Sequence, residues 1–149
     1  MDFIAVHRWC SLLSYGAFLI AFISGVLFLL QERQLKRKRM GWLFRRLPSL
    51  GLLDRVNFFA ISLGFGLLTV GATSGFIEMA RLRGSWWIGD PKEYATVALW
   101  GAYFVLWILR ERAVLRGRRV ALLSIAGFSL VLATFLGAGR LLPSLHPFI

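Results

Sequence analysis

Four long apolar runs, separated by short polar or basic stretches, constrain the fold of this chain more than any other feature. They cover approximately residues 3–30, 56–77, 94–109 and 120–142. A helix needs about 20 apolar residues to cross ~30 Å of hydrocarbon, and three runs reach that length. The third is shorter, so its start is expected close to the lipid headgroups. The pattern predicts an all-α integral membrane protein, a four-transmembrane-helix bundle forming a single membrane domain over residues 1–149.

The composition supports this class and narrows the partners. Hydrophobic residues make up 58% of the 149, and the formal net charge is +11. A basic chain can bind nucleic acid, but here the Lys and Arg residues cluster beside the apolar runs, where membrane topology explains them better. We therefore expect a lipid bilayer and no nucleic acid. The single cysteine, Cys10, excludes an internal disulfide and a thiolate metal cluster.

The distribution of Lys and Arg predicts the orientation. Two stretches between the apolar runs are rich in these residues: Arg33, Lys36, Arg37, Lys38, Arg39, Arg45, Arg46 and Arg55 in the first, and Arg110, Arg112, Arg116, Arg118 and Arg119 in the second. Cytoplasmic loops carry such an excess. We expect loops 31–55 and 110–119 in the cytoplasm of a bacterial inner membrane, crossed several times. Both termini and the loop 78–93 then face the outer, periplasmic side.

The outer loop holds an unusual segment, residues 84–93, with the sequence GSWWIGDPKE. Tryptophan favours the membrane–water interface because its ring is apolar and its N–H stays wet. The segment therefore indicates a surface that lies on the bilayer. Asp90 is placed to cap the third helix, with Pro91 in its first turn, where a missing N–H costs nothing.

Small residues spaced four apart indicate close helix packing. The pairs are Gly71 with Gly75, Ala17 with Ala21, Ala21 with Gly25, and Ala133 with Gly137. Such spacing lets helices approach one another in lipid. It supports a bundle and carries no chemistry.

Several functional classes lose support. No apolar run has an ionisable residue near its middle, which pumps, proton relays and voltage sensors need. There is no phosphate-binding loop, no HExxH pair and no nucleophile beside a base. We therefore name no catalytic residue, and a non-catalytic subunit is the expected class.

Two histidines, His7 and His146, are candidates for binding haem. They fall at the outer ends of the first and fourth predicted helices. Imidazoles from two helices can hold a haem iron between them. Four aromatic residues could wall a porphyrin: Trp9, Trp86, Trp87 and Phe148. Four cations could meet its propionates: Arg8, Arg83, Lys92 and Arg140. The alternative is that each histidine is an ordinary interfacial residue, and the residues alone leave both open.

A family resemblance favours the first interpretation. The chain resembles the C-terminal part of cytochrome c assembly proteins of the CcsA/ResC type, with HemX-like proteins as relatives. The resemblance rests on the stretches around His7, residues 30–36, residues 84–93 and the end of the chain. In that family two external histidines flank a tryptophan-rich "WWD" motif and ligate haem. It implies that His7 and His146 bind the iron of a non-covalent, b-type haem, and that Trp86, Trp87 and Asp90 lie beside it.

The chain departs from the family pattern in two respects. Arg83 and Gly89 stand where the family motif has tryptophans. Family members also carry further N-terminal helices, some with intramembrane histidines, which this sequence lacks. We expect a split or reduced member that keeps the outer site.

Three functions fit these observations. The first is a haem-handling protein of cytochrome c biogenesis, which holds haem at the outer face, works with a larger ResB-type membrane subunit and presents haem to apocytochrome c. The second is a haem b-bearing subunit of a respiratory or photosynthetic electron-transfer complex, in contact with its other subunits. The third is a haem-free anchor or a HemX-like regulator.

Overall fold

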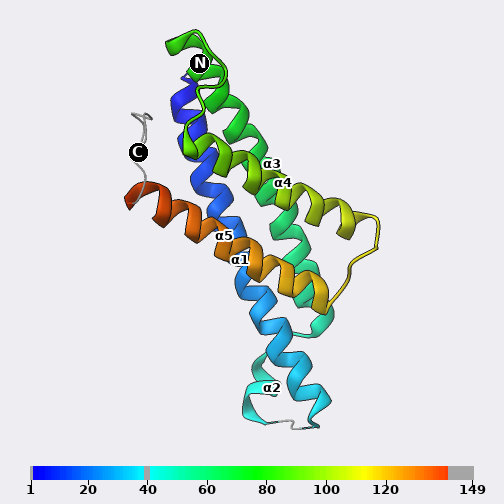
Figure 1. Ribbon diagram of the computed structural model, residues 1–149. Coiled ribbons are helices and arrows are strands. Elements are labelled where there is room, and N and C mark those ends of the chain that lie inside the picture. Colours follow the sequence, from blue (N-terminus) through cyan, green and yellow to red (C-terminus); the bar gives the residue numbers. More distant parts are fainter. Residues whose placement is uncertain (1, 39–40, 141–149) are drawn as a thin grey trace.

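The computed structural model describes residues 2–38 and 41–140, without the side chains of Leu43 and of residues 137–140. Throughout these residues the regular structure is helical, and no strand occurs, which confirms the all-α prediction (Figure 1). The helices are α1 Phe3–Lys36, α2 Trp42–Arg46, α3 Leu50–Arg83, α4 Pro91–Glu111 and α5 Arg118–Arg140.

Three of these helices are long and apolar enough to cross a membrane: α1, α3 and α5. They expose many large apolar side chains, as lipid-facing helices do. The third run of the sequence forms α4, which is not among the three. Trp100, Tyr103 and Trp107 make it less apolar, and charged residues occupy both of its ends. The four-span count therefore stays a prediction.

The helices extend beyond the apolar runs, so the loops are shorter than the sequence indicated. α1 continues to Lys36, and α3 begins at Leu50 and ends at Arg83. Polar residues alone do not end a helix, and cations in a last turn are favoured by the helix dipole. Left-handed residues follow the ends of α1 and α3, at Lys38 with φ 52° and at Gly84 with φ 69°. Only residues 84–90 and 112–117 connect the later helices.

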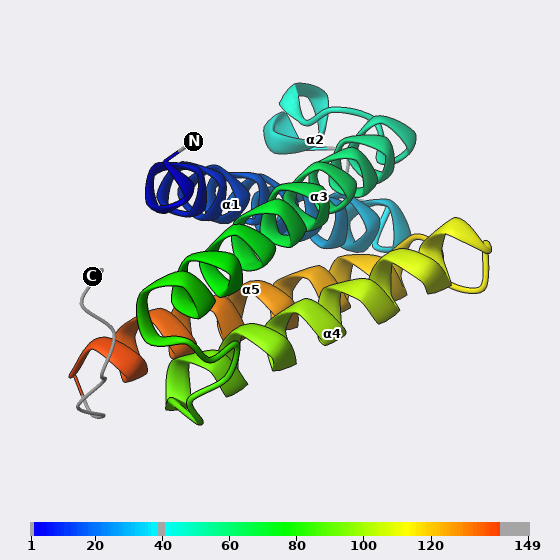
Figure 2. The ribbon, with the colours of Figure 1, turned by 90° about the horizontal axis from the view of Figure 1, so that it is seen from above.

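The long helices pack as two pairs. α1 lies along α3, and Figure 2 shows α4 and α5 side by side along one flank of that pair. Phe18 of α1 stacks on Tyr103 of α4, with ring centroids 3.7 Å apart and planes 17° apart. Ile61 of α3 and Val131 of α5 complete the same buried cluster. All four long helices therefore share one core.

Glycines permit the closest approaches, as the small-residue spacing predicted. A Cβ on Gly64 would lie 2.6 Å from Cε1 of Phe18, and one on Gly25 would lie 2.9 Å from Oγ of Ser124. Ala17 and Ala21 are buried between helices. Ala133 is exposed, so the prediction that it packs against a neighbouring helix is wrong.

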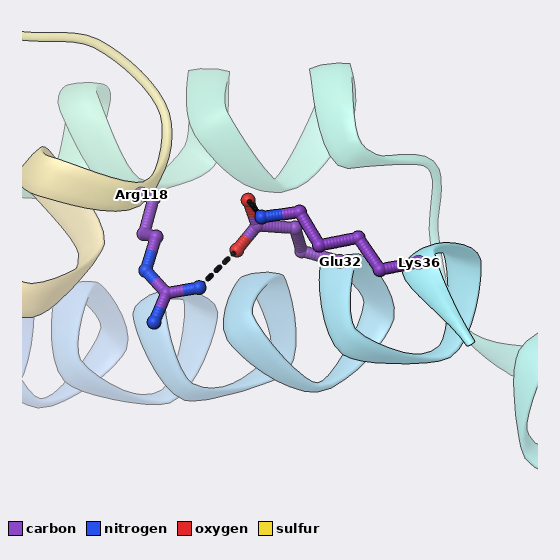
Figure 3. Close-up of polar contacts among 3 residues, drawn as sticks. All are labelled: Glu32, Lys36 and Arg118. Carbon is purple, nitrogen blue, oxygen red and sulfur yellow. Dashed lines mark hydrogen bonds and ion pairs between the residues drawn. The ribbon is translucent and has the colours of Figure 1, made fainter.

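Polar contacts between helices fix their register, and the sequence did not single them out. Asn57 of α3 donates through Nδ2 to the carbonyl of Ala21, at 2.6 Å, and to Oγ of Ser124, at 2.9 Å. Near the end of α1, Glu32 pairs with Arg118 of α5 at 3.4 Å, and also with Lys36 of its own helix at 3.0 Å (Figure 3). None of the residues in these contacts lines the cavity that lies where α1 begins.

Candidate functional site

A cavity of about 620 Å³ lies between the first turns of α1, the last turns of α3, the start of α4 and the end of α5. Its described lining is largely apolar, with Leu68, Phe76 and Phe135 among its walls. His7 lies in the wall together with the charged residues Arg8, Lys92 and Glu93. A mostly apolar cavity of ~300–1,000 Å³ with a few polar groups is typical of a small-molecule or cofactor site.

His7 is held in a defined orientation by the backbone of α3. Its Nδ1 lies 2.7 Å from the carbonyl oxygen of Gly71. A carbonyl only accepts hydrogen bonds, so Nδ1 carries the proton in this contact. In the neutral imidazole the lone pair then resides on Nε2. This is the arrangement of metal-ligating histidines, whose second ring nitrogen commonly donates to a carbonyl or carboxylate.

One glycine of α3, Gly75, makes room for that imidazole, and a second, Gly71, lets α1 approach closely at Ser11. A Cβ on Gly75 would lie 2.7 Å from Nδ1 of His7 and 3.0 Å from its Cε1, and one on Gly71 would lie 2.9 Å from Oγ of Ser11. The ring atoms nearest to a Cβ on Gly75 are Nδ1, Cε1 and Cγ, so Nε2 lies farther from Gly75 than they do. The sequence showed this glycine pair as a packing feature only. Its relation to His7 depends on the register of α1 against α3.

The start of α4 is organised by two buried carboxylates. Asp90, 3% exposed, accepts from the backbone N–H of Lys92 at 2.9 Å and caps the helix, and Pro91 is in the first turn, as predicted. Glu93, 4% exposed, accepts from the N–H groups of Ile88 at 3.1 Å, Gly89 at 2.9 Å and Asp90 at 3.3 Å. This is a capping box, and it fixes the loop of residues 84–90. Glu93 was not among the site residues taken from the sequence, although a glutamate three residues after a cap was a signal for it.

The two tryptophans of this loop lie outside the described cavity lining. Trp87 stacks on Phe76, with ring centroids 6.1 Å apart, and meets Tyr94 edge-on at 5.0 Å. Because Phe76 lines the cavity, Trp87 supports the wall from behind. Trp86 is 63% exposed. Phe76 is thus an aromatic wall residue that the sequence did not nominate.

Of the four cations that the sequence suggested for the propionates, the structure places two in the cavity wall. Arg8 and Lys92 line the cavity. Arg83 is engaged in a contact of its own and is not in the described lining. The side chain of Arg140 lies outside the described part of the chain. The structure thus brings together His7, Arg8 and Lys92.

His146 and Phe148 also lie outside the described residues, so the pairing of the two histidines stays a prediction. The segment that leads toward them does reach the site, because Thr134, Phe135 and Leu136 of α5 line the cavity. Among the described residues, no group of three or more His, Cys, Asp and Glu side chains could hold a metal ion.

Comparison with known proteins gives a family. Residues 2–146 match the model of the family described as Cytochrome C assembly protein. Similar curated proteins named "Cytochrome c biogenesis protein CcsA" occur in Prochlorococcus marinus. The protein of strain NATL1A is 35% identical over 96 residues, which are 64% of this chain and 30% of that protein. For strain MIT 9215 the identity is 38% over 96 residues, covering 64% of this chain and 31% of that protein. For strain MIT 9303 it is 34% over 108 residues, covering 69% and 34%.

The matched part of this chain spans about a third of the length of these curated relatives. No solved structure matches the chain. With three helices suited to cross a membrane, the chain is a multi-pass membrane protein. The match over nearly its whole length shows that it belongs to the cytochrome c assembly protein family.

Proposed function

We propose that this chain handles haem in cytochrome c biogenesis, with His7 as an axial ligand inside the cavity. One observation carries the proposal. The Nδ1–H of His7 is donated to the Gly71 carbonyl at 2.7 Å within the wall of a cavity of about 620 Å³. That contact orients the ring and leaves Nε2 as the basic nitrogen that iron binds.

The residues present fit a haem. The walls are mainly apolar, the one described histidine has the tautomer of a ligand, and two cations are available for the propionates. Haem, when bound, supplies an iron for axial ligation and vinyl groups that cysteine thiols can attack. His146 is our candidate for the second axial ligand, because the part of α5 that precedes it lines the same cavity. Trp87 would keep Phe76 against the ring, while the exposed Trp86 could contact haem only near the cavity mouth.

In this function haem is cargo. The chain would hold it non-covalently, as a b-type haem, and present it to apocytochrome c, whose Cys-x-x-Cys-His thiols form the bonds. The chain then needs no nucleophile of its own, in agreement with the absence of a nucleophile beside a base in the sequence. Because the family assembles cytochrome c, its partners should be apocytochrome c and other assembly subunits, among which we propose a larger, ResB-type membrane subunit.

The topology that this requires has four spans, with both termini and the loop of residues 84–90 on the outer face of a bacterial inner membrane. α4 would be the fourth span. Its 21 residues give a length of ~30 Å at about 1.5 Å per residue, enough to cross the hydrocarbon. The basic residues that precede α3 and α5 would face the cytoplasm.

The direct test is the absorption spectrum of the purified chain loaded with haem. We expect a Soret band whose position changes in His7→Gly and returns toward that of the wild type when imidazole is added to fill the vacated position. Arg81→Gln is the matched control, because Arg81 stacks on Phe3 at 4.3 Å and is not in the described cavity lining. A His7→Gly variant with the wild-type spectrum would rule out His7 as the ligand.

A transfer experiment separates delivery from permanent binding. Haem loaded on a handling protein should pass to apomyoglobin added in excess, within minutes. A haem that stays bound and cycles reversibly between oxidation states would favour the electron-transfer subunit. A chain that never acquires a Soret band would favour the haem-free anchor or regulator.

A further inference from the structure

We propose that Arg8 and Lys92 bind the two carboxylates of the porphyrin and so select a dicarboxylate ligand. This inference rests on the proposed function, since it assumes that the cavity receives haem. The two cations come from different helices, Arg8 from α1 and Lys92 from the first turn of α4, and both line the cavity.

The charges around the cavity leave these cations available for a ligand. The other described charged group in the lining is Glu93. Its carboxylate is buried and already accepts three backbone N–H bonds, so it is fixed in the capping box. None of the ion pairs between described residues includes Arg8 or Lys92. A ligand with two negative groups would complement this arrangement.

The two cations lie on helices that meet at the cavity. Arg8 follows His7 in α1, and both line the cavity, so a ring ligated by His7 lies within the reach of a long arginine side chain. Lys92 is at the N-terminal end of α4, where the helix dipole adds to its attraction for an anion. The nearby Arg81 stacks on Phe3 instead.

The experiment uses the full chain in detergent and metal-free protoporphyrin IX, whose fluorescence reports binding without any iron ligation. The probe is compared with its dimethyl ester, which has the same ring and no negative charge. We expect the diacid to bind about tenfold more tightly than the ester, because hydrogen bonds between charged groups are about twice as strong as neutral ones. Arg8→Gln and Lys92→Gln should each weaken diacid binding about threefold, so that together they remove the roughly tenfold preference. Both should leave ester binding unchanged, while Arg81→Gln should change neither.

Equal binding of the diacid and the ester would overturn this inference and leave the proposed function standing. So would an equal loss of both ligands in Arg8→Gln and Lys92→Gln, since that would indicate a structural role. Binding of neither porphyrin would overturn the inference, and the proposed function would fall with it only if the chain loaded with haem also lacked a Soret band. Because the probe carries no iron, a His7→Gly variant should retain its preference for the diacid, which separates this test from that of the axial ligand.

Discussion

Gly75→Ala is predicted to damage haem binding without damaging the fold. The added Cβ would lie 2.7 Å from Nδ1 of His7, whereas ordinary contacts begin at about 3.4 Å. The ring must therefore retreat by roughly 0.7 Å. Moving it away from α3 by that amount stretches the 2.7 Å contact with the Gly71 carbonyl to the limit of a hydrogen bond.

Two opposing effects determine how much Gly75→Ala changes the free energy of unfolding. Losing the hydrogen bond costs about 0.5–1.5 kcal/mol of folding free energy. Replacing glycine by alanine inside a helix returns about 0.5–1 kcal/mol. Stability should therefore change little. Loss of a partner that orients a metal ligand lowers affinity about 10- to 100-fold, so haem affinity should fall by that factor.

The assay is a haem titration followed by Soret absorbance, with thermal unfolding in the same detergent. Gly66→Ala is the matched control, because it makes the same change in the same helix at a position where a Cβ would meet nothing within 4 Å. If Gly75→Ala binds haem as tightly as Gly66→Ala, the backbone contact does not position His7 for iron and the reasoning is refuted.

Three further predictions concern the fold and the loop. Asn57→Leu, which removes the hydrogen bonds to the Ala21 carbonyl and Ser124, should lower the stability in detergent by about 1–2 kcal/mol; an unchanged unfolding temperature would contradict the register role. Glu93→Ala should cost about 1.5–3 kcal/mol and alter tryptophan fluorescence, since three backbone N–H groups lose a charged acceptor; an unaltered emission spectrum would show that the loop does not depend on it. In a background without Cys10, a cysteine at position 86 should be labelled by a membrane-impermeant maleimide in intact cells, and one at position 42 only after lysis; the reverse pattern would invert the proposed orientation.

Features set by local chemistry could be predicted from the sequence. The Asp90–Pro91 start of α4 depends on neighbouring residues only, and the structure has it as expected. The ends of the apolar runs did not mark the ends of helices, because a helix continues through polar residues until a cap or a left-handed residue stops it. α1 therefore runs to Lys36 and α3 begins at Leu50.

The candidate site could be predicted only in part. His7 stood out by its residue type, and Arg8 and Lys92 by their charge. The partner of His7 could not be found, because the Gly71 carbonyl is a backbone atom 64 residues away whose position depends on helix register. Phe76 was missed for the same reason, since only the folded chain shows it between the cavity and Trp87.

The contact between His7 and Gly71 has a consequence for finding such sites in other chains. A carboxylate that orients a metal-ligating histidine can be seen in the sequence as an Asp or a Glu. In this chain His7 is oriented by a main-chain oxygen instead, and its ring fits into space that Gly75 leaves open. The mark of such a site in the sequence is thus a missing side chain at position 75, one helical turn after the residue whose carbonyl accepts the hydrogen bond. A search of related membrane proteins should therefore compare residue size at position 75, because a larger residue there would displace the proposed ligand, His7, while every polar residue remained in place.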